Sequence, residues 1–182
     1  MTLILGMRVQ GGVIIAADSV TAGEHERRAD DRKIYVLPGL VWAAGGHSSN
    51  IDEFAVAVRS EPGMIWEAAW HLERATAMAE RNKALAARGN DHLDDRPWPN
   101  VIFTDGVRLA QVTQDGAMWG HQSYTVSGPC DDVAYYLIRK QWRPDLTPEE
   151  GVALAIFALT EAAAETVWAA PPINVEFVPA GA

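Results

Sequence analysis

The pattern of apolar and polar positions along the first 45 residues predicts two β-hairpins. Gly11-Gly12 and Pro38-Gly39 both suit tight turns, and each pair lies between two apolar runs. Because one of these runs, residues 13–17, is apolar at consecutive positions, we expect a strand that is covered on both faces. The predicted strands are residues 2–9, 13–17, 34–37 and 40–44.

Helical spacing follows these strands. Asn50 with Glu53 three residues later is typical of a capping box, which predicts a helix near residues 51–59. A longer helical pattern covers residues 64–88. The next stretch, residues 88–100, is polar and contains prolines, and it is too short to separate two domains.

The second half of the chain repeats this order of strands followed by helices. A helix is expected at residues 131–142, and Thr147, Pro148 and Glu150 predict the start of another by their capping pattern. Residues 151–170 are apolar nearly all round, so we expect this helix to be buried on more than one side. The further predicted strands are residues 101–104, 108–113, 117–120, 123–128 and 173–178.

The order of these elements favours an α+β fold. Two packed sheets with a pair of helices outside each, a four-layer αββα sandwich, is the economical arrangement of this order. No internal repeat or low-complexity segment interrupts the chain, so we expect residues 1–182 to form a single domain. Other α+β layouts would fit the same order of elements.

Composition narrows the class of protein. The chain has 182 residues, 48% of them hydrophobic, and a formal net charge of −9, which is typical of one compact soluble domain. An acidic chain without a basic run or a membrane-length apolar run argues against nucleic-acid and membrane partners. The single Cys130 and the lack of a signal-peptide pattern favour the cytoplasm. The five histidines have no metal-ligand spacing, so we expect neither a metal nor a cofactor.

Thr2 carries the first candidate chemistry. A Thr that follows the initiator Met becomes the N-terminal residue when that Met is removed, which is the usual processing before small residues. A free Thr offers a hydroxyl nucleophile and an α-amine whose unperturbed pKa, about 7.7–8.0, allows it to act as the base. The simpler interpretation is that Thr2 only begins the first strand, and Thr2 taken alone favours it.

Two charged residues and a glycine pair would complete such a site. Asp18 ends an apolar strand and Lys33 opens another, and a buried pair beside Thr2 would lower the pKa of the amine. Gly45-Gly46 would let backbone N–H groups approach a developing oxyanion. Without further context, Asp18 and Lys33 are better explained as a strand-end pair that faces solvent.

An ordered set of motifs runs along the chain: Thr2 with Gly6, the runs 16–19, 21–23 and 43–46, Lys33, and Ser127-Gly128. This set resembles the proteasome β-subunit and HslV family of N-terminal-nucleophile hydrolases. No single motif is specific, but their order is, and the resemblance covers nearly the whole chain. It implies the four-layer αββα fold of the N-terminal-nucleophile hydrolase type and favours a bacterial proteasome homologue.

The resemblance implies a role for each matching residue. Thr2 would be the nucleophile and its freed amine the general base. Lys33 would tune the electrostatics of that amine, and Asp18 would orient Lys33. Gly45 would supply the oxyanion N–H, and Ser127 would support the amine.

The resemblance also implies substrate contacts. Thr21 and Gly45 would pair with the extended backbone of the substrate. The residues at positions where the family lines its first specificity pocket are Ala22, Asp31, Tyr35, Ala43 and His47.

The chain departs from the family pattern at four places, one of which is Val126-Ser127-Gly128, where the family has Gly-Ser-Gly before its third helix. The motif that contains Asp18 is one residue shorter than in the family, so the following loop must differ. Near the fourth helix the family has an Asp followed three residues later by a Ser; here Glu165 is followed by Trp168, so Glu165 is a catalytic candidate without the supporting hydroxyl. Only Met1 precedes Thr2, so removal of Met1 is expected to expose the nucleophile.

Three functions follow from these residues and this resemblance. The first is a threonine peptidase that cleaves peptide or unfolded-protein substrates inside a self-compartmentalising ring of identical subunits, stacked face to face. An ATP-dependent unfoldase would be its partner, and the sequence does not identify one. The second is an N-terminal-nucleophile amidohydrolase that acts on small amides with the same residues. The third is a proteolytically silent ring subunit with a structural role.

Overall fold

The chain is divided into two compact units in the computed structural model. The first unit comprises Met1–Gly45, Val101–Gln111 and Gly120–Ala182, and the second comprises Gly46–Asn100 and Val112–Trp119. The residues that the structure describes are 2–19, 21–22, 27–28, 33–46, 48–88 and 98–181.

The first unit is built around a four-stranded antiparallel sheet with the order β10-β1-β2-β11. Strands β1 and β2 form the hairpin predicted around Gly11-Gly12, with Ile4 opposite Ala17. Both central strands therefore have a strand on each side, and residues at their ends are held by two neighbours. The strands are β1 (Ile4–Val9), β2 (Gly12–Asp18), β10 (Tyr124–Ser127) and β11 (Ile173–Pro179).

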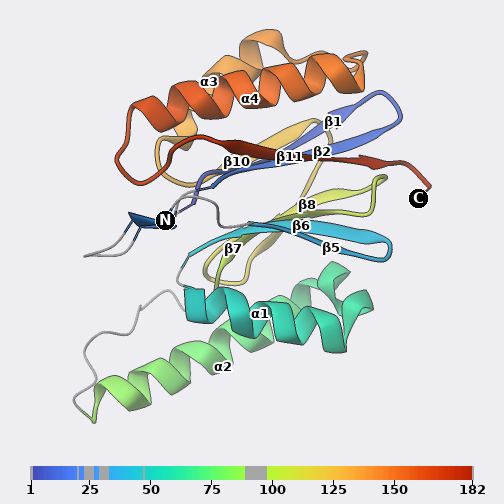
Figure 1. The fold of residues 1–182 in the computed structure, drawn as a ribbon. Helices are drawn as coiled ribbons and strands as arrows, with labels where there is room; N and C mark the ends of the chain where they lie inside the picture. The colour runs from blue at the N-terminus through green and yellow to red at the C-terminus, as the bar shows by residue number, and fades with distance from the viewer. Residues whose placement is uncertain are drawn as a thin grey trace. The chain divides into compact units, whose positions relative to one another are not determined.

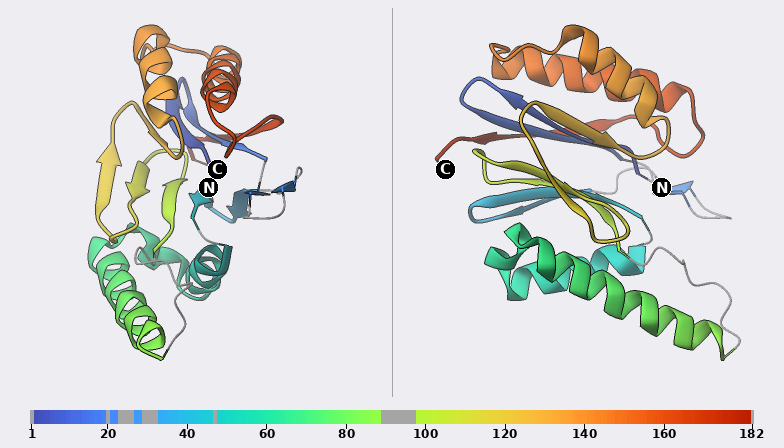
Figure 2. Two further views of the ribbon diagram at one scale, coloured as in Figure 1. Left: turned by 90° about the vertical axis from the view of Figure 1, so that its left-hand side faces the viewer. Right: turned by 180° about the vertical axis from the view of Figure 1, so that it is seen from behind.

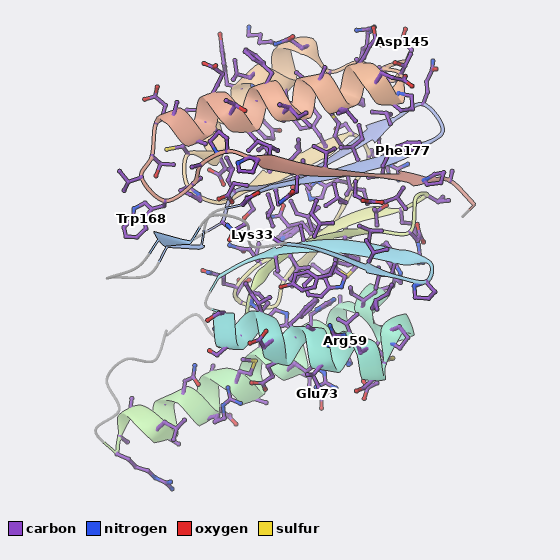
Figure 3. The ribbon with its side chains drawn as sticks, viewed as in Figure 1. Lys33, Arg59, Glu73, Asp145, Trp168 and Phe177 are labelled. Carbon is purple, nitrogen blue, oxygen red and sulfur yellow. The ribbon has the colours of Figure 1, made fainter. Side chains whose placement is uncertain are left out.

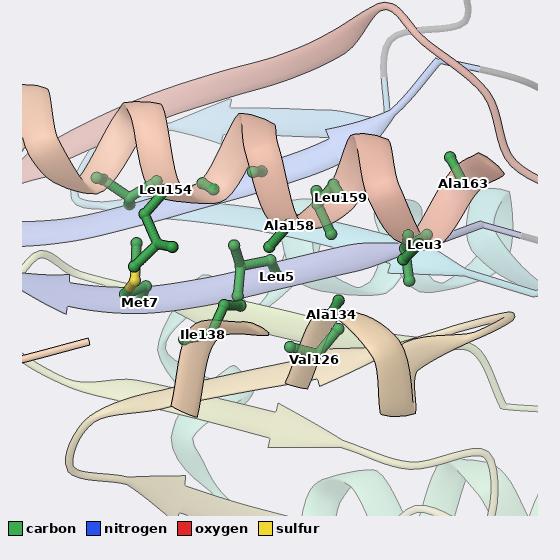
Figure 4. Packing of buried hydrophobic residues seen from close by; sticks show 14 of the residues in the cluster. Leu3, Leu5, Met7, Val126, Ala134, Ile138, Leu154, Ala158, Leu159 and Ala163 are labelled. Atoms are coloured by element: carbon green, nitrogen blue, oxygen red, sulfur yellow. The ribbon is translucent and has the colours of Figure 1, made fainter. Parts of the chain in front are cut away.

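Two helices, α3 (Asp131–Gln141) and α4 (Pro148–Ala164), cover one face of this sheet (Figure 1). Helix α4 begins with the predicted capping box: the Thr147 hydroxyl accepts from the Glu150 N–H at 3.3 Å, and the Glu150 carboxylate accepts from the Thr147 N–H at 3.0 Å. Figure 4 shows the buried contact between β1 and both helices. Its members include Leu3, Leu5, Met7, Ala134, Ile138, Leu154 and Leu159.

The outer side of α4 differs from the prediction. Leu154, Ala158 and Leu159 are buried against the sheet, but Ile156 is 41% exposed and Phe157 is 44% exposed. The prediction of burial on more than one side is therefore wrong within this chain. The reason is that only one face of α4 meets the sheet and α3, while the apolar residues of the other face have no cover within the described chain.

The second sheet has the order β5-β6-β7-β8-β9. Its bounds are β5 (Ile34–Leu37), β6 (Leu40–Gly45), β7 (Asn100–Thr104), β8 (Leu109–Val112) and β9 (Met118–His121). Within the first unit, apolar side chains of both sheets form one cluster, which includes Ile4, Val13, Ile15, Val41, Ala43, Ile102 and Leu109. Figure 2 shows β5 and β6 along the face of the first sheet that α3 and α4 leave free. A short pair, β3 (Thr21–Ala22) and β4 (Arg27–Arg28), is also antiparallel.

The second unit contains α1 (Ser48–Ser60), the 3₁₀ turn η1 (Pro62–Trp66) and α2 (Ala68–Ala86). The aromatic rings of Phe54, Trp70, His71 and Trp98 pack together, with ring centroids 4.9–6.3 Å apart. Burial lowers the pKa of His71 below its usual value, while the hydrogen bond that Nε2 donates to the Ile65 carbonyl, 2.8 Å long, opposes this shift. His71 is therefore neutral in the folded state near pH 7.

Two predicted boundaries in this unit are wrong. Helix α1 begins at Ser48, so Asn50 lies inside it, and the Glu53 carboxylate accepts a hydrogen bond from Arg81 at 2.8 Å instead of returning to a cap. The predicted helix at residues 64–88 is interrupted, because Glu67 has extended backbone angles (φ −100°, ψ 109°) that separate η1 from α2.

Taken element by element, the chain is a mixed α+β protein with two antiparallel sheets, so the broad fold class is confirmed. Across the described residues, no helix combines the length and the apolar character needed to cross a membrane.

Candidate active site

Thr2 lies two positions before the first residue of β1 and is approached by two glycines. A Cβ atom on Gly45 would come within 3.0 Å of the Thr2 carbonyl oxygen and 3.3 Å of the Thr2 Cβ. A Cβ atom on Gly128, whose φ is +130°, would come within 2.2 Å of the same oxygen. Glycine at these two positions is therefore what lets both segments approach Thr2, which is itself only 8% exposed. The predicted nucleophile and the predicted oxyanion donor lie together.

Asp18 lies next to Thr2 through the pairing of β1 and β2. The Asp18 N–H donates to the Leu3 carbonyl at 3.1 Å, and the Leu3 N–H donates to the Asp18 carboxylate at 2.9 Å. The side chain of Asp18 thus takes the place of a backbone acceptor at the end of the hairpin. Its carboxylate is fixed to the residue that immediately follows Thr2.

Lys33 completes a buried ion pair with Asp18. Its Nζ donates to both carboxylate oxygens, at 3.0 and 3.1 Å, and the side chains of Lys33 and Asp18 are 7% and 0% exposed. Lys33 directly precedes β5, so the pair joins the hairpin to the second sheet within the first unit (Figure 3). Removing both charges from water is costly, and the Leu3 N–H helps to offset that cost by giving the carboxylate another donor. The interpretation of a pair that faces solvent is wrong.

Ser127 is the last residue of β10 and pairs with Ile4 across the sheet. It is buried, and it directly precedes Gly128, the glycine that approaches Thr2. The structure therefore brings five predicted site residues to one end of the first unit: Thr2, Asp18, Lys33, Gly45 and Ser127.

Glu165 occupies a different position. It caps the C-terminal end of α4, where its carbonyl accepts a long hydrogen bond from the Cys130 thiol at 3.7 Å, and its residue is exposed. In the contacts between described residues, its carboxylate does not join the group formed by Asp18 and Lys33. The catalytic role of Glu165 stays a prediction.

Among the predicted substrate-binding residues, Tyr35 and Ala43 point to opposite faces of the β5–β6 hairpin. Ala43 is fully buried in the cluster between the sheets, opposite Ile34. Tyr35 pairs with Trp42, and their rings stack with centroids 3.9 Å apart, so Tyr35 points to the opposite face of the hairpin from Ala43. Thr21 and Ala22 form β3, while Asp31 and His47 lie outside the described residues.

Two residues at this end of the sheet were not predicted. Ser19, 1% exposed, donates its hydroxyl hydrogen bond to the Pro172 carbonyl at 2.6 Å and accepts one from the Asn174 amide at 2.8 Å. Two sequence features could have pointed to them: the Ser that directly follows Asp18 and the single amide in the segment 173–178.

The chemistry that these groups support is acyl transfer to a hydroxyl. Thr2 offers the hydroxyl, the buried Lys33 offers a fixed positive charge, and the backbone N–H near Gly45 can stabilise an oxyanion. Among the described residues, no group of three or more His, Cys, Asp or Glu side chains could hold a metal ion.

This chain is similar to one known family and to a solved structure. Residues 101–178 match the family model described as "Proteasome subunit". The fold is similar to that of Anbu (ancestral beta-subunit) from Yersinia bercovieri, with a TM-score of 0.68 and 18% sequence identity. The match covers 97% of this chain and 81% of that chain. At 18% identity this likeness shows the fold alone, and the family model supplies the evidence from sequence. Together, the family-model match and the shared fold support a proteasome β-subunit or HslV-like family member.

Proposed function

We propose that this chain is a threonine peptidase subunit that hydrolyses peptide bonds with Thr2 after removal of Met1. The observation that carries the proposal is the buried ion pair of Lys33 and Asp18, which is bonded to the backbone of Leu3 immediately after Thr2. A structural ion pair can lie anywhere in a core. This one is bonded to the residue that follows Thr2, and Gly45 approaches Thr2 closely.

The proposed reaction has two steps. The Thr2 Oγ1 attacks the peptide carbonyl carbon while the freed α-amine accepts its proton, and an N–H at Gly45 stabilises the oxyanion. The C–N bond then breaks, the leaving amine takes the proton, and an ester of Thr2 remains. A water molecule, deprotonated by the same amine, attacks the ester and releases the acid. The positive charge of Lys33 favours the unprotonated amine, and Asp18 holds Lys33 in place.

The proposal also assigns a role to each of the other predicted residues. Ser127 supports the amine, and Glu165 is a further candidate for the same task. Thr21 and Gly45 pair with the substrate backbone, and the first specificity pocket involves Ala22, Asp31, Tyr35, Ala43 and His47. In this proposal the chain forms one domain over residues 1–182 with the four-layer αββα sandwich of N-terminal-nucleophile hydrolases. The protein acts in the cytoplasm.

Self-association into stacked rings is also part of the proposal, since proteasome-like proteins generally form such rings. Support comes from the apolar side chains that the first unit leaves exposed on its helices. Tyr135 and Tyr136 on α3 are 47% and 59% exposed, and Ile156 and Phe157 lie uncovered on α4. In the proposed ring, a neighbouring subunit covers these side chains. An ATP-dependent unfoldase would deliver unfolded substrates to the chamber.

The experiment compares peptide hydrolysis by the wild type, Thr2→Ala and Thr2→Ser, with particle size measured by light scattering. We expect hydrolysis of short peptidyl coumarins by a large particle, loss of hydrolysis in Thr2→Ala, residual hydrolysis in Thr2→Ser, and the same particle size in all three. Hydrolysis that persists in Thr2→Ala would contradict the proposal. A monomer or dimer that cleaves only small amides would favour the small-amide amidohydrolase, and an inactive ring would favour the silent subunit.

A further inference from the structure

We infer that Ser19 and Asn174 form a positioning pair that holds Asp18 in register with Leu3 and Lys33. The geometric part of the inference concerns the folded chain alone. Its catalytic part rests on the proposed function, because it states that this register sets the rate at which Thr2 reacts. Neither residue is assigned to contact the substrate.

The pair lies at the point where β2 ends. Asp18 is the last residue of β2 and is opposite Ile173, and Asn174 is opposite Ala17 on the same neighbour, β11. Beyond Asp18 the ladder between β2 and β11 stops. The Ser19 hydroxyl continues the attachment with its own two hydrogen bonds, one to the Pro172 carbonyl at 2.6 Å and one from the Asn174 amide at 2.8 Å.

The attachment matters because Asp18 must meet two donors at once. Its carboxylate accepts from the Leu3 N–H at 2.9 Å and from Lys33 at 3.0 and 3.1 Å, and its backbone N–H bonds to the Leu3 carbonyl. Hydrogen bonds weaken steeply as length and angle depart from these values. A chain that is free to move at Ser19 would move the carboxylate that directly precedes it.

The burial of Ser19 supports the same reading. Ser19 is 1% exposed, and a buried hydroxyl costs free energy unless it is bonded, so its two partners, the Pro172 carbonyl and the Asn174 amide, are required. Asn174 and Glu176 are the two polar side chains of β11, and the Asn174 amide donates its hydrogen bond to Ser19.

A matched control separates positioning from simple loss of a buried hydrogen bond. The hydroxyl of Thr104, fully buried at the end of β7, donates to the Arg108 carbonyl at 2.6 Å and accepts from the Gly106 N–H at 2.9 Å. Thr104→Val therefore removes nearly the same bonds as Ser19→Ala, in the same unit, but away from Asp18. A difference between the two variants reports on position rather than on stability alone.

The first measurement is native-state hydrogen exchange at the Leu3 amide in wild type, Ser19→Ala and Thr104→Val. We expect Ser19→Ala to accelerate exchange at Leu3 about tenfold or more beyond Thr104→Val, because the Leu3–Asp18 bond opens locally. Equal exchange at Leu3 in the two variants would overturn the inference. This readout needs no catalytic activity.

The second measurement is the rate constant and the half-saturating concentration for acylation of Thr2 by a β-lactone. We expect Ser19→Ala to lower the rate constant about tenfold or more without changing the half-saturating concentration, while Thr104→Val stays within about twofold of the wild type. Asn174→Ala should add little to Ser19→Ala in the double variant, because both act through one bond.

The outcomes distinguish the two claims. Acylation of the wild type with an unchanged rate in Ser19→Ala would overturn the catalytic part of the inference. A wild type that is not acylated would count against the proposed function, and the Leu3 exchange would still decide whether Ser19 positions Asp18.

Discussion

Lys33→Met tests how strongly the folded chain depends on the buried ion pair. The substitution replaces the ammonium with an apolar side chain of similar length and leaves the Asp18 carboxylate, 0% exposed, bonded to the Leu3 N–H. Both Lys33 oxygen contacts, at 3.0 and 3.1 Å, are lost. The variant therefore creates a buried charge whose counter-ion has been removed.

The magnitude follows from this geometry. Removal of one partner of a buried pair typically destabilises a protein by about 3–5 kcal/mol. The Leu3 N–H still donates to the carboxylate, and a hydrogen bond to a charged group contributes about 1.5–3 kcal/mol. We therefore expect a loss near the lower end, about 3 kcal/mol, which is a large share of the usual stability of a domain.

Urea unfolding at pH 7, followed by tryptophan fluorescence at a fixed protein concentration, measures this loss. The double variant Lys33→Met/Asp18→Asn is the matched control, because it removes both charges and keeps an oxygen that can accept from Leu3. We expect the double variant to recover most of the lost free energy of unfolding. A single variant within about 1 kcal/mol of the wild type would refute the reasoning, because a surface ion pair contributes no more than that.

Three further predictions test other parts of the structure. Gly45→Ala should slow acylation of Thr2 about tenfold or more, because the new Cβ would lie 3.0 Å from the Thr2 carbonyl oxygen. Gly120→Ala, which has open space around its Cβ, should leave the acylation rate unchanged. Equal acylation rates in both variants would refute the close approach of Gly45 to Thr2. Because burial lowers the pKa of His71, the folded state binds fewer protons than the unfolded state. The contribution of neutral His71 to the free energy of unfolding is therefore complete above about pH 6.5 and is lost as the pH falls below that value. His71→Phe should flatten this dependence in urea unfolding at pH 5, 6.5 and 8, and an unchanged slope would contradict the assignment. Thr147→Ala should reduce the free energy of unfolding by about 1 kcal/mol through loss of the cap of α4, and no change in the urea midpoint would show that the cap is not needed.

The elements that could be predicted from sequence are those whose signals are local. The hairpin at Gly11-Gly12 and the capping box of Thr147 and Glu150 each depend on residues within a few positions of one another. The cap predicted at Asn50 is wrong because α1 already begins at Ser48, and Glu53 bonds instead to Arg81, which is 28 residues away and on another helix. A capping pattern cannot reveal a competing partner at that distance.

In the candidate site, too, local sequence patterns could not reveal contacts that depend on packing between distant segments. Asp18 and Lys33 were expected to pair because the ordered motifs resemble a known family, yet local charge patterning alone favoured exposure to solvent. Burial is a property of the packed sheets, which a pattern around two residues does not contain. The bond between Ser19 and Asn174 spans 155 positions, so it could not be predicted from either segment.

The outer face of α4 was misjudged for a related reason. A helix that is apolar nearly all round indicates burial, but the pattern does not say whether the cover comes from the same chain. Ile156 and Phe157 are uncovered in the described chain, and the proposed ring assembly would supply their cover from another subunit.

Intact-mass analysis before and after treatment with a β-lactone tests the central claim most directly, namely that Thr2 with a free amine is the nucleophile. The account predicts loss of Met1 in the purified native protein, one adduct per chain that maps to Thr2, and no adduct in Thr2→Ala. Met1 retained on every molecule, or a processed chain that takes up no adduct at Thr2, would contradict it.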